Sequence, residues 1–185
     1  DSNYISNNII IPYVKSLGIK KINYLILTHG DFDHDGAKES LCKNFNVKKV
    51  VDSKYEFPIK VGDLTLENLN RYNLEGNNEN SLAIYTEFID KKWLFMGDCP
   101  LEIEKLIIKD CPNLEADVLK VGHHGSITST CYEFLKAIKP KEAIISVGKN
   151  NSYGHPDSKV ISRLKSENIK VRRTDIEGSI SYFSF

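Results

Sequence analysis

Residues 28–36 read THGDFDHDG and directly follow the apolar run YLIL at residues 24–27. Such an apolar run is typical of a buried strand, and the Gly and Asp residues after it are typical of a loop. Four residues of metal-binding types stand in this loop at positions i, i+2, i+4 and i+5: His29, Asp31, Asp33 and His34. Alternate side chains of extended chain share one face, so the first three should point the same way. The fourth should begin the next helix and face the same pocket. The spacing predicts a loop that divides its ligands between two adjacent ions.

The same stretch also has an ordinary structural interpretation, as a polar turn before a helix. Gly30 and Gly36 would then provide the turn geometry, and Asp35 would cap the helix. Two His and two Asp at this spacing after a buried strand favour the metal-binding interpretation.

Three later motifs also place polar side chains directly after strand-like runs. The run LFMGD ends at Asp98, whose carboxylate could bridge two cations, although Gly-Asp also forms ordinary turns. The stretch DVLKVGHHGS carries His123 and His124, and VGKNNSYGHP carries His155. Paired histidines can also cap a helix, and a loop histidine can simply lie at the surface. However, all five His residues of the chain follow predicted strands, and sites in open α/β sheets gather at the carboxyl ends of strands.

The apolar pattern alternates strand-like runs with helical stretches, which predicts an α/β fold in a single domain, residues 1–185. A helix at 9–17 should be capped by Asn8, and Gly62-Asp63 should turn a hairpin within residues 57–69. Further strands are expected at 24–28, 47–51, 81–88, 93–96, 117–121 and 142–147, further helices at 37–43, 101–109, 129–138 and 157–167, and a closing strand pair around Gly178.

Composition excludes several classes of protein. Of the 185 residues, 41% are hydrophobic and 27% are charged, and no apolar run is long enough for a transmembrane helix. Basic and acidic residues number 25 each, so the formal net charge of zero argues against a uniformly basic, sequence-independent DNA-binding surface. A local basic groove is compatible with it. The four cysteines form no C-x-x-C pair, which indicates reduced, mostly buried thiols rather than a disulfide framework.

These residues resemble the metallo-β-lactamase superfamily, whose motif H-x-[HD]-x-D-H stands here at residues 29–34. With MGD at 96–98, VGHHGS at 121–126 and GHP at 154–156, nearly the whole chain is similar to the C-terminal domain of the ComEC family of DNA-internalisation competence proteins. The resemblance implies a metallo-β-lactamase-like αβ/βα sandwich that lacks its first strands, because the chain starts after the point where the family places them. It also implies a soluble domain whose parent protein is membrane-associated through a transmembrane channel region, with the side of the membrane left open.

The resemblance further implies a hydrolase with two divalent metal ions, Zn²⁺ or Mn²⁺, with Mg²⁺ also allowed by the oxygen-rich ligands. One ion would take the first two ligands of the 28–36 loop, with Asn80 as a further candidate, and the other ion would take the last two. His155 is favoured over His123 and His124 to complete the second ion, and Asp98 would bridge. The implied metal ligands are therefore His29, Asp31, Asp33, His34, Asp98 and His155.

The implied activity is hydrolysis of a DNA phosphodiester by activated water, with degradation of one strand during DNA uptake. Asp33 would belong to the catalytic machinery, and His123 or His124 would protonate the departing sugar oxygen. Candidate substrate contacts are Asn80, Lys120, Ser126, Lys149 and Asn150. Two alternatives stay open: another hydrolase on the same fold, acting on a thioester, lactone or small phosphodiester, and a non-catalytic module that binds DNA or a channel partner.

Overall fold

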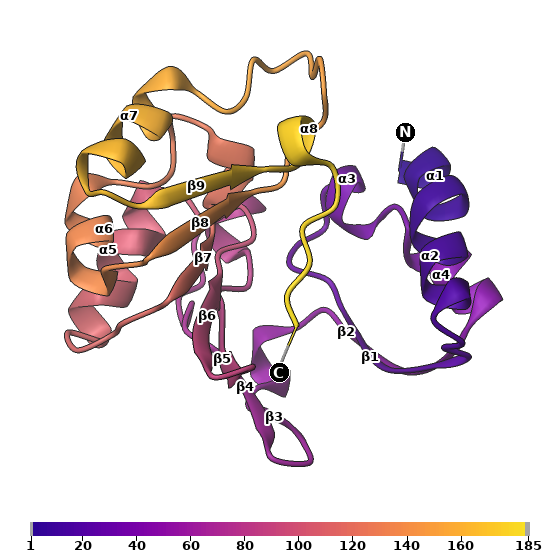
Figure 1. Ribbon diagram of the computed structural model, residues 1–185. Helices are drawn as coiled ribbons and strands as arrows, with labels where there is room; N and C mark the ends of the chain where they lie inside the picture. The colour runs from indigo at the N-terminus through magenta and orange to yellow at the C-terminus, as the bar shows by residue number, and fades with distance from the viewer. Residues whose placement is uncertain (1, 184–185) are drawn as a thin grey trace. The chain divides into compact units, whose positions relative to one another are not determined.

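The structure is a computed structural model that describes residues 2–183 (Figure 1). It divides into two compact units, Asp1–Glu56 and Phe57–Phe185. The expectation that residues 1–185 form a single domain stays a prediction.

The first unit joins a pair of parallel strands to a set of helices. Its strands pair in register from Lys21 opposite Asn46 to Ile26 opposite Val51. The helices bury Ile11, Leu41 and Phe45 as a small core, against which apolar side chains of both strands pack. In chain order the elements are α1 (Ser2–Ile5), η1 (Ser6–Ile10), α2 (Ile11–Ser16), β1 (Lys21–Ile26), α3 (Phe32–Asp35), α4 (Lys38–Asn44), β2 (Asn46–Val51) and η2 (Lys54–Glu56).

The N-terminal helix begins earlier than the sequence pattern predicts. The expectation that Asn8 caps a helix at 9–17 was wrong, because helical structure runs from Ser2 through α2 with a π-helical turn in η1. Asn8 lies inside this helix, and its side-chain amide donates a hydrogen bond to the Tyr4 carbonyl one turn earlier. An Asn that finds a partner within its own helix does not mark a boundary.

The second unit is built on a seven-stranded sheet whose strands lie side by side in chain order. The strands from β3 to β6 pair antiparallel, and those from β6 to β9 run parallel. The hairpin predicted around Gly62-Asp63 is confirmed as β3 and β4, and the predicted pairing of the next two strands is confirmed as β5 and β6. The strands are β3 (Ile59–Val61), β4 (Leu64–Asn68), β5 (Ile84–Phe88), β6 (Lys91–Phe95), β7 (Val118–Lys120), β8 (Glu142–Ile145) and β9 (Lys170–Arg173).

Three helices connect the parallel strands of this sheet: α5 (Leu101–Asp110), α6 (Tyr132–Ile138) and α7 (Ser158–Ser166). Crossovers between parallel strands are right-handed, and the strands advance in one direction, so all three helices lie on the same face of the sheet (Figure 1). Their buried side chains form the main core with inward-facing residues of the strands, such as Leu94, Leu119 and Ala143. The carboxyl ends of β6 to β9 therefore share one edge, from which the loops that carry Asp98, His123, His124 and His155 start.

Short helical turns complete the unit: η3 (Asn78–Asn80), η4 (Gly122–Gly125) and α8 (Thr174–Glu177). The α/β class predicted from the sequence is confirmed by this strand–helix alternation. Among the described helices, none combines the length and the apolar character that crossing a membrane requires.

The chain after β9 differs from the prediction of a closing strand pair around Gly178. That expectation was wrong, because the chain turns into α8 directly after Arg173 and residues 178–183 form no strand. Both acidic side chains of α8 bind the preceding arginines: Asp175 pairs with Arg173 at 2.6 Å and Glu177 pairs with Arg172 at 2.8 Å. Carboxylates in the first turn stabilise a helix N-terminus, and Gly178 then ends the helix with a φ of 72°.

Helix α7 begins with a side-chain cap. Asp157 accepts a hydrogen bond from the Lys159 amide at 2.7 Å, one of the amides that have no partner within the first turn. Replacing Asp157 with alanine is expected to lower the free energy of unfolding by about 1 kcal/mol, whereas Asp157→Asn, which keeps an acceptor oxygen, should change it much less. Urea unfolding followed by circular dichroism measures both variants, and equal losses in the two would contradict the capping role.

Candidate metal centre

In the first unit, the loop between β1 and α3 gathers the four predicted ligands of the 28–36 stretch. The backbone of Asp31 is extended, and its carbonyl accepts hydrogen bonds from the amides of His34 and Asp35 at 2.8 and 3.0 Å, which starts α3. This turn brings the rings of His29 and His34 to a centroid separation of 4.1 Å. His34 therefore lies within a one-turn helix rather than further along the chain, and it faces back towards the strand end.

Each histidine of this loop has one ring nitrogen held by Thr28 and the other beside a carboxylate. The Thr28 hydroxyl lies 3.1 Å from His29 Nδ1 and 2.9 Å from His34 Nδ1. The Nε2 atoms lie 3.4 Å from Asp31 in the case of His29, and 3.8 Å from Asp33 in the case of His34. Histidines that bind metals generally use one nitrogen for the ion and the other for an orienting hydrogen bond. His29 and His34 both have this arrangement, and the same Thr28 hydroxyl orients both rings.

In the second unit, the turn after β6 and the paired-histidine loop after β7 meet at Asp98. The Asp98 side chain is buried, and its Oδ2 atom lies 3.8 Å from Nε2 of His123 and 3.8 Å from Nε2 of His124. The backbone joins the two segments as well, since the His123 amide donates to the Gly97 carbonyl at 3.0 Å. A Cβ on Gly122 would stand 3.1 Å from the Cys99 carbonyl, so a glycine permits this close approach.

The paired histidines sit in a strained backbone that other groups hold in place. His123 and His124 both have a positive φ, 47° and 51°, which non-glycine residues seldom adopt and which concentrates at functional sites. The buried Ser129 hydroxyl donates to the Gly122 carbonyl at 2.8 Å and lies 3.1 Å from the Ser126 carbonyl, so it closes the loop from the inside.

The side chains of the pair are oriented in the same way as those of the first unit. His124 Nδ1 lies 2.7 Å from the Ser146 carbonyl, and His123 Nδ1 lies 3.1 Å from the Thr128 hydroxyl. A carbonyl oxygen can only accept, so Nδ1 of His124 carries a proton and its Nε2 is the nitrogen that faces Asp98.

The loop after β8 brings His155 to the same edge. The ring of His155 lies 5.9 Å from that of His123, edge to face. A Cβ on Gly125, whose φ is 81°, would stand 2.7 Å from Pro156, so only glycine lets the two loops pack this closely. Burial lowers the pKa of His155, and the positive charges that His123 and His124 can carry lower it further. Asp98, His123, His124 and His155 thus form one cluster within the second unit.

Three of the five predicted substrate contacts lie at the end of β7 or in the loop after β8. Lys120 ends β7, and its ammonium donates to the Val121 carbonyl at 2.9 Å; burial lowers its pKa, while the negative charge of nearby Asp98 acts in the opposite direction. Lys149 and Asn150 are exposed in the loop after β8.

Ser126 and Asn80 take part in holding loops. Ser126 is buried, with its hydroxyl 3.0 Å from that of Thr128. The Asn80 amide donates to the Gly76 carbonyl at 2.7 Å, which fastens the 74–80 loop.

Sequence reasoning missed the groups that orient the histidines. A hydroxyl directly before His29 is a signal that could have identified Thr28. The Ser146 carbonyl belongs to the backbone, 22 residues away from His124, so the residue type at position 146 does not predict this contact. Its position depends on the pairing of β7 with β8.

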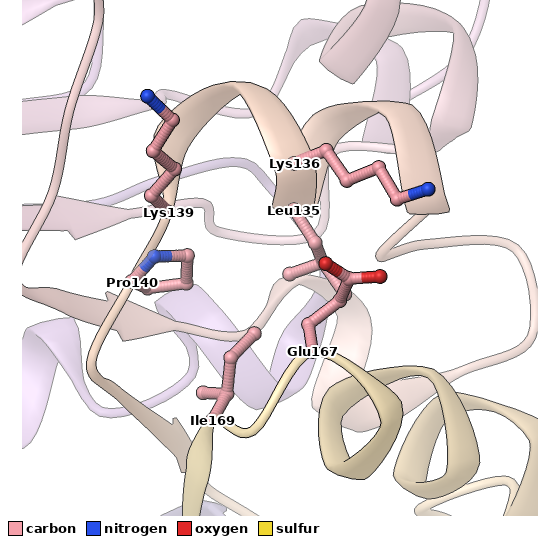
Figure 2. Close-up of a pocket in the computed structure, with 6 residues that line it drawn as sticks. All are labelled: Leu135, Lys136, Lys139, Pro140, Glu167 and Ile169. Carbon is pink, nitrogen blue, oxygen red and sulfur yellow. The ribbon is translucent and has the colours of Figure 1, made fainter.

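Within the second unit, a pocket of about 300 Å³ lies at the amino ends of β8 and β9, away from the cluster around Asp98 (Figure 2). It stands between the last turns of α6 and α7, opposite the sheet edge that carries the motif loops. The lining residues are Leu135, Lys136, Lys139, Pro140, Glu167 and Ile169. None of the predicted site residues belongs to it.

The side chains of both units fit divalent metal ions. Each cluster combines imidazole nitrogens with carboxylate oxygens. In His29, His34, His123 and His124 the Nδ1 atom has another partner and the Nε2 atom faces a carboxylate. Imidazole suits Zn²⁺, and the carboxylates suit harder ions such as Mn²⁺ and Mg²⁺.

Comparison with known proteins agrees with this chemistry. Residues 3–70 match the family model of the metallo-beta-lactamase superfamily. The chain is 36% identical to ComE operon protein 3 of Bacillus subtilis over 206 aligned residues, which cover 96% of this chain and 26% of that protein. It is 29% identical to competence protein ComA of Neisseria gonorrhoeae, with coverages of 94% and 27%, and 30% identical to recombination protein 2 of Haemophilus influenzae, with coverages of 92% and 23%. The chain spans about a quarter of the length of these relatives.

Among solved structures, a mutant of the CmlA beta-hydroxylase matches with a TM-score of 0.51 and 12% identity, over 83% of this chain and 43% of that chain. At this identity the match concerns the fold alone. The fold is one that binds divalent metal ions, and the His and Asp side chains at 29–34, 98 and 155 are candidate ligands for them. The resemblance inferred from the sequence is confirmed: residues 3–70 match the metallo-β-lactamase superfamily, and nearly the whole chain is similar to one part of the ComEC-type competence proteins.

Proposed function

We propose that this chain is a metal-dependent phosphodiesterase domain that cleaves DNA during its uptake and degrades one of the two strands. The observation that carries the proposal is the donor arrangement, in which oriented Nε2 atoms face carboxylate oxygens in both units. DNA is the proposed substrate because the relatives include a competence protein and a recombination protein. In this proposal the domain works next to a membrane channel segment of its parent protein.

The proposed ligands follow the superfamily motif. One ion would be held by His29 and Asp31, with Asn80 as a further candidate, the other by Asp33, His34 and His155, and Asp98 would be the ligand that the two share. When bound, two such ions lower the pKa of a water and stabilise the attacking and leaving oxygens of an in-line displacement.

Charge favours an anionic substrate at such a centre. The three carboxylates of Asp31, Asp33 and Asp98 carry three negative charges, and two divalent ions carry four positive charges. The site is then net positive before the substrate arrives, which attracts a phosphodiester. The ammonium groups of Lys120 and Lys149 and the amide of Asn150 are proposed to donate hydrogen bonds to the phosphate oxygens. Ser126 and Asn80 stabilise neighbouring loops through their own hydrogen bonds.

Histidines of the chain are also proposed to transfer protons. The Ser146 carbonyl fixes the ring of His124 so that Nε2 is the nitrogen that exchanges a proton on the side of Asp98. His124, or its neighbour His123, is proposed to protonate the departing sugar oxygen, which for general acid catalysis contributes about 10²- to 10⁴-fold. The carboxylate of Asp33 lies 3.8 Å from His34 Nε2, and it is proposed to bind the same ion as His34.

The proposed function is tested with the purified chain, Mn²⁺, Zn²⁺ or EDTA, and four substrates: plasmid DNA, a labelled single strand, bis-p-nitrophenyl phosphate and a thioester. Metal-dependent cleavage of DNA and of the small phosphodiester, with the thioester left intact, is the expected result. Thioester hydrolysis without phosphodiester cleavage would instead indicate another hydrolase. DNA binding without cleavage in any metal would indicate a non-catalytic module.

Replacing His124 with alanine is expected to leave the metal content unchanged and to slow DNA cleavage by about 10²- to 10⁴-fold, because a proton donor is lost. Metal content is measured by mass spectrometry of the dialysed protein, alongside single-turnover rates. His124→Gln serves as a variant of similar size. Loss of an ion from either variant would move His124 from the proton donors to the ligands.

A further inference from the structure

An aromatic ring stands open to solvent beside one of the candidate metal ligands. Tyr153 is 81% exposed, although aromatic side chains usually bury most of their surface. One face of its ring lies over His155, with centroids 5.8 Å apart and planes only 17° from parallel. The exposed ring is thus held parallel to the imidazole of a residue at the candidate site.

The loop that carries Tyr153 is braced from within. The Asn151 side-chain amide donates to the His155 carbonyl at 2.7 Å and to the Gly148 carbonyl at 3.1 Å. The Asn151 side-chain oxygen accepts a hydrogen bond from the His155 amide at 2.9 Å. These three bonds tie both ends of the loop around Tyr153. A ring that is positioned before a ligand arrives loses little conformational entropy when the ligand binds.

The chemistry of the surroundings selects the kind of ligand. A flat unsaturated ring can stack on Tyr153, and the exposed Lys149 and Asn150 of the same loop offer a cation and an amide to an attached phosphate. Proteins that bind single strands combine these two features, with stacking that tolerates any base. A base inside a duplex already stacks on its neighbours and pairs across the helix, so it does not reach the ring without being extruded.

We propose that Tyr153 is a stacking platform for an unpaired nucleobase next to the phosphodiester that is cut, which makes a single strand the preferred substrate. The proposal rests on the proposed phosphodiesterase function and adds the residue that distinguishes a single strand from a duplex. Tyr153 acts as a specificity-determining residue and takes no part in the bond-breaking step.

The test compares two single-stranded oligonucleotides that differ only in whether the nucleotides around the cleaved bond carry bases or are abasic. The wild-type chain should favour the base-bearing strand in KM by about 5- to 150-fold, the range that one base–aromatic stack produces. Tyr153→Ala should remove this preference while leaving cleavage of the abasic strand unchanged. Tyr153→Phe and Tyr153→Trp should keep it, because both retain a ring.

A matched control is Tyr55→Ala, since Tyr55 is 78% exposed and lies on η2 in the first unit. This variant should retain the preference, and the thermal midpoints of all variants should be similar because both tyrosine side chains are mostly exposed. A preference that survives in Tyr153→Ala, or that is lost equally in Tyr153→Phe, would overturn the proposal.

Binding separates this inference from the proposed function. Fluorescence anisotropy in EDTA measures the Kd of both strands without cleavage, and the same loss of preference is expected in Tyr153→Ala. If the wild-type chain cuts neither strand in any metal, the phosphodiesterase proposal fails, and the ratio of the two Kd values still decides whether Tyr153 stacks on a base.

Discussion

Replacing Asp33 with alanine is expected to abolish DNA cleavage and to remove metal from the protein while the fold remains intact. The side chain of Asp33 is 61% exposed, so its removal leaves no cavity and no buried group without a partner. Its carboxylate lies 3.8 Å from His34 Nε2, and in the proposed centre both bind the same ion. Loss of that ion removes the activated water on which hydrolysis depends.

The measurement combines metal analysis after dialysis, the rate of cleavage in Mn²⁺ or Zn²⁺, and circular dichroism. His34→Ala should give the same result. Asp35→Ala is the matched control, because Asp35 stands on the same four-residue helix with the same charge and is not a proposed ligand. Full activity in both Asp33→Ala and His34→Ala would sink the ligand assignment, and equal metal loss in Asp35→Ala would indicate damage to the loop.

Replacing Glu104 with alanine should destabilise the second unit by about 2–6 kcal/mol, because two buried backbone amides lose their acceptor at about 1–3 kcal/mol each. Glu104 lies on α5 with no exposed surface, and its carboxylate accepts hydrogen bonds from the amides of Thr130 and Cys131. Arg163 of α7 donates to the carbonyls of Ser129 and Thr130, both at 3.1 Å. Two helices therefore anchor the segment that supports the paired-histidine loop.

Urea unfolding of wild type and Glu104→Ala measures this difference. Glu102→Ala is the control on the same helix, since Glu102 is exposed, and it should change the free energy of unfolding by less than about 0.5 kcal/mol. A loss as small in Glu104→Ala as in Glu102→Ala would contradict the anchoring role.

The same carboxyl makes stability depend on pH. Burial raises the pKa of Glu104 from its ordinary 4.5 to about 7, although the two backbone amides and Arg163 act in the opposite direction. Between these values the folded chain keeps a proton that the unfolded chain has lost, so stability falls as pH rises and levels off above about pH 7. The contribution lost over this window is about 3 kcal/mol.

Glu104→Gln removes this titration without removing the side chain. The difference in unfolding free energy between wild type and Glu104→Gln should therefore shift in favour of the variant from pH 4.5 to pH 7. A difference that stays constant across this range would show that Glu104 titrates alike in the folded and unfolded chains.

The candidate site was predictable wherever its residues are close in sequence. The candidate ligands at residues 29–34 gather because one strand end, one extended segment and one helical turn place them, and all of these are local. Asp98, His123 and His155 were predictable as a group because each follows a strand, and parallel strands end at one edge of a sheet.

The sequence by itself therefore determined the α/β alternation, the hairpin at Gly62-Asp63 and the types of ligand, since each depends on the periodicity or spacing of neighbouring residues. Tertiary structure decided that the Ser146 carbonyl orients His124. It also decided that Glu104 binds the backbone amides at 130 and 131. Finally, it decided that the chain after β9 forms α8, because the hydroxyl of Thr174, the first residue of that helix, hydrogen-bonds to the amide and the carbonyl of Val147, 27 residues away. These contacts depend on strand register and on helix packing across the sheet, so a pattern of residues along the chain does not specify them.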